Sequence, residues 1–203
     1  TKADMLFHVV TIVWGAHHTD IFLRLTLPNV LSPGNLPALA GAHAARYRIY
    51  TTPADRTRIE SHAIGRRLAE IMPVEFVMPL GERQPDVSYH VHWFHRSAAE
   101  AKRAGAIAVF VPPDTLWSDG TFRRCGAVMA AGKKAIAVPF LQVVAETCIP
   151  EALERFGGPP GQGLPPSRGT RGCAGGRRDQ SSSCPPGRCS AAGRSPSCSR
   201  LCP

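Results

Sequence analysis

The amino-acid sequence predicts an α/β fold, a three-layer sandwich in which helices cover both faces of a mainly parallel sheet. Short apolar runs rich in β-branched residues alternate along the chain with segments of helical periodicity. The first run, FHVVTIVW at 7–14, is apolar on both faces, which is typical of a strand at the centre of a parallel sheet. Because strands and helices alternate, we expect right-handed crossovers between consecutive strands.

The first half of the chain supplies two strands and two helical segments. Gly15 ends the first strand, and Thr19 or Asp20 is placed to cap the helix that follows. The composition of SPGN at 32–35 predicts a turn, after which a short helix resumes over 36–45. The run YRIYT at 47–51 then reads as the second strand.

The second half continues the alternation. Thr52 precedes a Pro at a first helical position, which starts a helix that runs to about Met72. The further expected elements are a strand at 74–77, a helix that ends at Gly105, a strand at 107–111, a helix at 122–131, a fifth strand at 135–138, and a helix at 142–156 that is broken at Pro150.

Composition divides the chain at residue 156, into an α/β domain over 1–156 and a tail over 157–203. The tail consists mainly of Gly, Pro, Ser, Arg and Cys, so it has too little apolar surface to offset the entropy of ordering it, and we expect it to be disordered. Arginine-rich RNA binding and a zinc knot are alternative functions for it. Its composition is also that of a GC-rich gene read out of frame, in which case the domain is truncated.

Charge and cysteine content limit the class of protein. The net charge is +9, but the tail alone carries +6, so the domain is nearly balanced and its charge argues against a nucleic-acid partner. Two separated cysteines in the domain, Cys125 and Cys148, fit a reducing cytoplasm. No stretch approaches the roughly 18 apolar residues of a membrane span, and the first strand begins too early to leave room for a signal peptide.

Polar residues directly after the fourth strand mark a candidate site. In open α/β sheets, ligands bind beyond the carboxyl ends of the strands, which is where Asp114 and Asp119 are expected. Such a carboxylate can hold a divalent metal on a diphosphate or accept a hydrogen bond from a sugar hydroxyl. Alternatively, Asp114 caps the following helix and Asp119 belongs to a turn. Trp117 either stacks on a sugar or base or lies in the core.

Glycines and histidines give weaker signals. WGAHH after the first strand is neither a dinucleotide fingerprint nor a phosphate-binding loop. His90, His92 and His95 form HxHxxH, in which a pair of imidazoles can bind a transition metal, although no nearby carboxylate completes a ligand set. The neighbouring histidines His17 and His18 are expected in a loop, either solvated or facing a substrate.

The segment VFVPPDTLWSDGTF resembles the acidic strand end of nucleotide-diphospho-sugar transferases with the glycosyltransferase A fold. The likeness covers about residues 5–150, includes SPGNLPAL and YTTPAD, and is closest to uncharacterised bacterial members. It implies a nucleotide-sugar donor, an unknown acceptor, and Asp114 as the residue that orients the donor. The donor-binding residues that it implies are Val13, Trp14, Gly15, Thr51, His95, Arg96, Trp117 and Asp119.

One departure from that pattern bears on activity. The family's metal motif has two acids one residue apart, and with Asp114 as the second acid, Pro112 stands at the first position. Half of the usual manganese or magnesium site is therefore missing, and Asp114 is the acid of that motif that remains to hold such a cation. The resemblance implies a hexosyltransferase, and the departure keeps open an inactive α/β module that binds a ligand or a partner.

Overall fold

The computed structural model of the protein describes residues 5–78, 87–139, 143 and 145–156. Its centre is a four-stranded parallel sheet with the order β3-β2-β1-β4. The strands are β1 (Leu6–Ile12), β2 (Ala44–Tyr50), β3 (Val74–Val77) and β4 (Ile107–Phe110). This architecture confirms the predicted α/β class and its parallel sheet.

The central strand β1 pairs in parallel with both of its neighbours. Val9 lies opposite Tyr47 of β2 and opposite Val109 of β4. Val9 and Val10 point to opposite faces of the sheet and both are buried, which accounts for the apolar character of both faces of this strand. In chain order, β2 and β3 are added on one side of β1, and β4 is added on the other side of β1.

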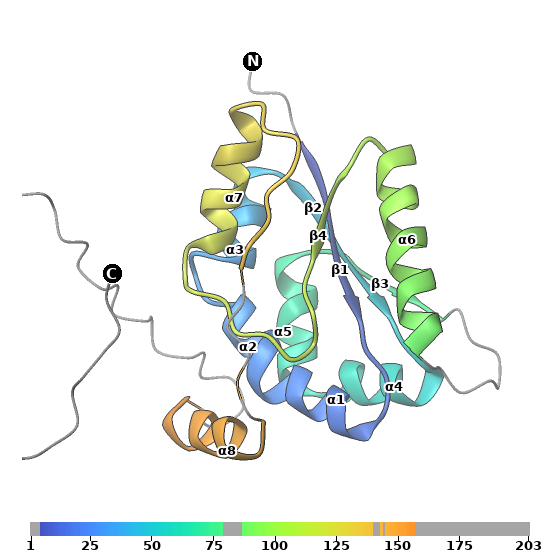
Figure 1. Ribbon diagram of the computed structural model, residues 1–203, viewed down its shortest axis with the longest axis vertical. Helices are drawn as coiled ribbons and strands as arrows, with labels where there is room; N and C mark the ends of the chain where they lie inside the picture. Colours follow the sequence, from blue (N-terminus) through green and yellow to red (C-terminus); the bar gives the residue numbers. More distant parts are fainter. Residues whose placement is uncertain (1–4, 79–86, 140–142, 144, 157–203) are drawn as a thin grey trace, which may run out of the picture. The chain divides into compact units, whose positions relative to one another are not determined.

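Helices cover the two faces of the sheet unequally (Figure 1). One face carries η1 (Phe22–Thr26, a π-helix), α2 (Leu27–Val30), α3 (Leu36–Ala42), α5 (Ala63–Ile71) and α7 (Thr121–Ala130). Among the described residues, α6 (Val87–Arg103) alone covers the other face. Two further helices, α1 (Ala16–Ile21) and α4 (Pro53–Ser61), begin just after β1 and β2. The predicted three-layer arrangement is therefore present.

The face under α6 contains a partly buried ion-pair network. Arg48 of β2, 8% exposed, donates to Glu75 of β3 at 3.0 Å and to Glu100 of α6 at 2.6 Å. The Tyr50 hydroxyl also donates to Glu100, at 2.9 Å. Burial alone would raise the pKa of Glu100, but hydrogen bonds from Arg48, Arg96 and Tyr50 outweigh it and lower that pKa to about 2.

Several helix boundaries differ from the predicted ones. The first helix, α1, begins at Ala16 with Gly15 as its N-cap, before either predicted cap residue. The helix predicted over 53–72 is two helices, α4 and α5, because His62 between them is extended. The His62 side chain accepts a hydrogen bond from the backbone N–H of Ile64 and so caps α5.

The predicted fifth strand is wrong within the described residues, since 135–138 pairs with no strand there. Ile136 of this segment is 38% exposed, so the segment lacks the two-sided burial of a parallel strand. The predicted helix break is also wrong, because α8 (Ala145–Phe156) continues through Pro150. Packing of Ala152 against Ile21 and Leu25 offsets the hydrogen bond that Pro150 cannot make.

Two further predictions concern a membrane span and the tail of the chain. No helix among the described residues is long and apolar enough to cross a membrane. The predicted tail, 157–203, lies outside the described residues.

Candidate functional site

A pocket of about 320 Å³ lies at the carboxyl ends of β1 and β4. The strand order reverses between these two neighbours, and open α/β sheets bind their ligands at such a switch point. The residues that line the pocket are Ile12, Val13, Trp14, His18, His90, Pro112, Pro113 and Asp114. The pocket thus combines an apolar wall with a small number of polar groups, as small-molecule sites do.

The wall from β1 is formed by Val13 and Trp14, both predicted from the sequence. The Val13 N–H donates to the carbonyl of Tyr50 at 3.0 Å, which continues the β1–β2 ladder and fixes the direction of the chain. The Trp14 ring lies 5.9 Å from the ring of His90, between centroids, so α6 and β1 meet at this wall. An aromatic surface of this kind can stack on a base or a sugar.

Asp114 stands on the opposite wall, after β4. The Val111 N–H donates to Val10 at 2.8 Å, and the Thr26 hydroxyl donates to the Pro113 carbonyl at 2.7 Å. These two bonds anchor the segment on both sides of the Pro112–Pro113 pair. Asp114 itself is exposed and lines the pocket, so its carboxylate is accessible to a ligand.

Two histidines come together at this pocket from distant parts of the chain. His18 belongs to α1 and His90 to the first turn of α6. Both side chains are exposed, and an imidazole nitrogen can either donate or accept a hydrogen bond. The sequence singled out each histidine, one as substrate-facing and one as part of HxHxxH, but gave no sign that they share a pocket.

Gly15 and Thr52 are joined by a buried carboxylate that the sequence reasoning treated only as part of a helix start. Asp55, 8% exposed, accepts from the Gly15 N–H at 2.9 Å and from the hydroxyls of Thr19 and Thr52 at 3.0 and 2.8 Å. Thr52 in turn caps α4 by accepting from the Asp55 N–H at 3.1 Å. The spacing T-x-x-D is a capping-box signal, but its reach to Gly15 depends on tertiary structure.

Thr51, the next predicted site residue, lies at the carboxyl end of β2 and is 2% exposed. Its N–H donates to Val77 at 3.1 Å, while its hydroxyl has no hydrogen-bond partner among the described residues. It does not line the pocket between β1 and β4.

Trp117 and Asp119 lie elsewhere and hold the loop after β4 to the segment before α3. The Trp117 N–H donates to the side chain of Asn29 at 2.6 Å, and the amide of Asn29 donates back to the Trp117 carbonyl at 2.8 Å. One oxygen of Asp119 accepts from the Ser32 hydroxyl at 2.9 Å and from the Gly34 N–H at 2.7 Å. These contacts give both residues a structural role.

His95 and Arg96 are on α6, more than a turn beyond His90, and neither lines the pocket. Arg96 forms an ion pair with Glu100 at 3.0 Å, and its guanidinium lies 4.8 Å from the centroid of the Trp93 ring. The structure therefore brings Val13, Trp14 and Asp114 together and leaves His95, Arg96, Trp117 and Asp119 apart from them.

The arrangement of the described residues bears on the cation that the resemblance implies. No three side chains of His, Cys, Asp or Glu converge among them in the geometry of a metal site. In the pocket, Asp114 has Pro113 and Pro112 before it, and neither has a side-chain ligand atom.

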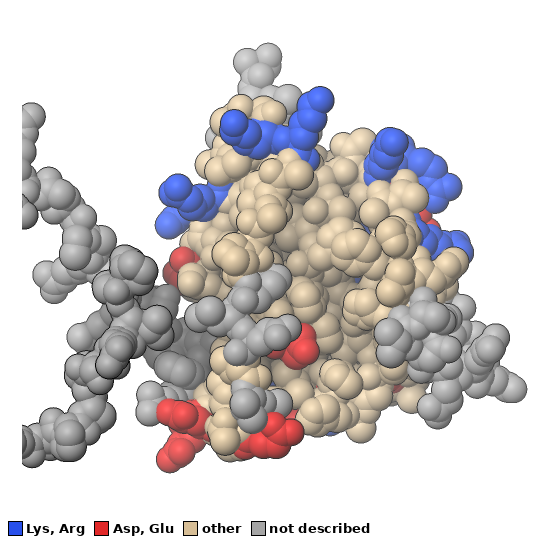
Figure 2. Space-filling view, viewed as in Figure 1, with Lys and Arg blue, Asp and Glu red and all other residues tan. Residues whose placement is uncertain are grey.

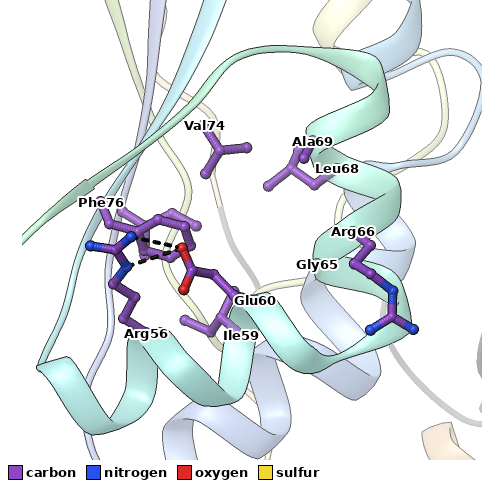
Figure 3. Close-up of a pocket in the computed structure, with 10 residues that line it drawn as sticks. Arg56, Ile59, Glu60, Gly65, Arg66, Leu68, Ala69, Val74 and Phe76 are labelled. Atoms are coloured by element: carbon purple, nitrogen blue, oxygen red, sulfur yellow. Dashed lines mark hydrogen bonds and ion pairs between the residues drawn. The ribbon is translucent and has the colours of Figure 1, made fainter.

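A second pocket, of about 390 Å³, lies between α4, α5 and the β2–β3 edge (Figure 3). Arg56 lies 5.3 Å from the centroid of the Phe76 ring and forms an ion pair with Glu60 at 3.0 Å. The floor is aliphatic, from Ile59, Leu68 and Val74. Glu60 is paired with Arg56, and the third charged residue of the lining, Arg66, donates to the backbone carbonyl of Ser61.

Comparison with protein-family models, with curated proteins and with solved structures finds no match to this chain.

Proposed function

We propose that this domain binds a nucleotide-diphospho-sugar in the pocket between β1 and β4, and that it transfers the sugar to an acceptor. The observation that carries the proposal is the position of Trp14 and Asp114. The sequence marked both from separate segments, and both line one pocket at the switch point of the sheet.

Each polar group of the pocket has a role in this proposal. Asp114 accepts a hydrogen bond from a sugar hydroxyl and so orients the donor. His18 and His90 donate hydrogen bonds to phosphate oxygens. This role falls to them because the residues that line the pocket include no Lys and no Arg. Trp14 stacks on the base or the sugar.

A second function is an inactive module that binds a nucleotide without transferring a sugar. Two charged residues that the resemblance implies at the donor, Arg96 and Asp119, favour this inactive module. Arg96 is paired with Glu100, and Asp119 accepts hydrogen bonds from the 32–34 turn. A site with one carboxylate and two imidazoles can still bind a nucleotide. It has few groups with which to stabilise the charge that develops in the transition state of sugar transfer.

Thermal unfolding of the full chain with nucleoside diphosphates and nucleotide sugars tests the proposal. A ligand at about 100 times its dissociation constant stabilises the native state by about 2.7 kcal/mol, which raises the melting temperature by about 5–10 °C for a domain of this size. We expect one nucleotide series to give such a shift. The Asp114→Asn variant should lose the part of the shift that the sugar adds.

The matched control is Glu70→Gln, which neutralises an exposed carboxylate on α5, away from the pocket. It should leave the ligand response unchanged. If no nucleotide raises the melting temperature of a well-folded sample, the donor-binding proposal is refuted. Release of nucleoside diphosphate from the sugar donor then separates the two functions, because the inactive module binds the donor and releases none.

A further inference from the structure

Among the described residues, β4 is an edge strand of the sheet. It pairs with β1, and no other described strand lies beside it. The segment 135–138, in which the sequence predicts the next strand, forms no ladder with it. Figure 1 shows this edge in front of the other strands, between the helical layer that contains α7 and the layer of α6.

Some backbone N–H and C=O groups of β4 point away from β1, toward the position of a further strand. The Val111 N–H points inward, to the carbonyl of Val10, at 2.8 Å. Because successive residues of a strand direct their backbone groups to opposite sides, Val109 also faces β1, while Ala108 and Phe110 direct their N–H and carbonyl groups outward. Unpaired groups of this kind are a template for another strand.

The two edges of the sheet differ in protection. The outer strand β3 follows Pro73 and carries Glu75, whose side chain is 46% exposed, and Arg56 lies over its Phe76 ring. Charges and prolines of this kind discourage edge-to-edge association. From Ala104 to Val111, in contrast, the sequence AGAIAVFV contains no charged residue and no proline. The β4 edge therefore lacks these protecting residues.

Apolar side chains extend the surface beside this edge. Phe94 of α6 stacks on Phe110 with 4.0 Å between ring centroids and remains 39% exposed. Val91, one turn earlier on the same side of α6, is 51% exposed. A strand of four residues makes few backbone bonds, so these side chains must supply the remaining contact.

Opposite charges lie at the two ends of the same face. The α6 helix ends in Lys102 and Arg103, at the amino edge of the sheet, and exposed lysines follow α7 at 133 and 134. At the carboxyl edge, α8 packs on η1 and exposes Glu146, Glu151 and Glu154. Figure 2 shows Lys and Arg toward the top of the view and Asp and Glu at the lower left, over α8.

We propose that this face binds a second copy of the same chain, with the two β4 strands antiparallel. The two-fold axis of such a pair is normal to the sheet, so each helical layer continues into its own counterpart and the strand direction is reversed. In the layer that contains α7 and η1, that reversal brings Lys133 and Lys134 of each copy near the acidic α8 of the other. Parallel stacking of two copies would place like charges together, so the charge distribution selects the two-fold arrangement.

The test is the mass of the full chain in solution, by sedimentation equilibrium over the micromolar range. We expect a species of twice the 21.8 kDa chain mass. Ala108→Pro removes an N–H that points away from β1, so it blocks the edge without breaking the β1–β4 ladder, and it should weaken the dimer at least about tenfold. Val91→Glu, on an exposed helix position, should do the same without touching the sheet.

Two controls separate this interface from others. Met78→Glu adds the same charge at a residue that is 43% exposed and follows β3, and it should leave the dimer intact. Reversal of Lys133 and Lys134 to Glu should weaken the dimer, and the further change of Glu151 and Glu154 to Lys should restore it.

Amide hydrogen exchange gives an independent result. The amides of Ala108 and Phe110 should become protected as concentration rises, whereas that of Val109 should be protected throughout. A monomer at all concentrations, or a dimer that both Ala108→Pro and Val91→Glu leave unchanged, refutes the proposal. Constant rapid exchange at Ala108 and Phe110 within a dimer refutes it too, because the copies then meet elsewhere.

Discussion

The Asp55 carboxylate offers the most direct test of how the pocket is built. It ties the turn after β1 to the start of α4 through the Gly15 N–H and the hydroxyls of Thr19 and Thr52. Gly15 directly follows Trp14, so the same bonds hold the aromatic wall of the pocket. Asp55→Ala removes all three acceptor contacts at once.

The expected cost follows from the exposure of the three donors. Hydrogen bonds to a charged group contribute about 1.5–3 kcal/mol each. After truncation, the donors at Gly15 and Thr52 can turn to water, because neither residue is buried. The Thr19 hydroxyl cannot, since that side chain is fully buried. We therefore expect Asp55→Ala to lower the free energy of unfolding by about 2–4 kcal/mol, less than the sum of three such bonds.

Urea unfolding of the full chain measures this loss. The control is Asp20→Ala, which removes exposed ion pairs with Arg24 and Arg58 and should cost about 0–1 kcal/mol. A double-mutant cycle with Thr19→Val should show coupling between Thr19 and Asp55. Equal losses for Asp55→Ala and Asp20→Ala would refute the assignment of Asp55 as the tie between the two strand ends.

Two further outcomes test other parts of the fold. Gly34→Ala should destabilise the protein by about 1–3 kcal/mol in urea unfolding, because a Cβ there would lie 2.5 Å from the Gly120 nitrogen, and Gly41→Ala, with open space, is its control. His8 is 4% exposed, and burial and then the charges of Arg48 and Arg46 lower its pKa from 6.5. The native state thus disfavours the imidazolium, so stability is present above pH 6.5 and is lost as pH falls through the lowered pKa. His8→Leu should unfold less readily than the parent chain as pH falls from 7 toward 5; an unchanged pH profile would exclude His8 as the cause.

The strands of the sheet were predictable because burial on two faces leaves a direct mark on sequence. Residues 7–14 and 107–111 are nearly all apolar, and both form strands at the centre or edge of the sheet. The apolar run at 135–138 bears the same mark and forms no strand. A short apolar run indicates only that its residues avoid water. A strand inside a parallel sheet also needs other elements packed on both of its faces, and Ile136 is 38% exposed.

The site was predictable in part, and the reason lies in how polar residues are used. Asp114 and Asp119 follow the same strand five residues apart, and local sequence does not distinguish them. Tertiary structure does so, because the turn at 32–34 supplies two donors to Asp119 and none of the described residues forms a hydrogen bond to the side chain of Asp114. The partnership of His18 and His90 is equally invisible to sequence, since α1 and α6 are brought together only by the sheet.

The segment PPDTLWSDGTF is therefore best understood as a loop held to the fold by hydrogen bonds, with one residue, Asp114, that faces the pocket. Thr26, Asn29 and Ser32 bind it at three successive points, through the Pro113 carbonyl, Trp117 and Asp119. Gly34 permits the close approach, since any side chain there would meet Gly120 and Asp119. Hydrogen bonds that are satisfied internally cannot also hold a ligand, so most of the polar residues of this phrase are committed to the fold. Together they fix Asp114 opposite Trp14, and the donor binding that we propose for this pocket depends on that separation being constant.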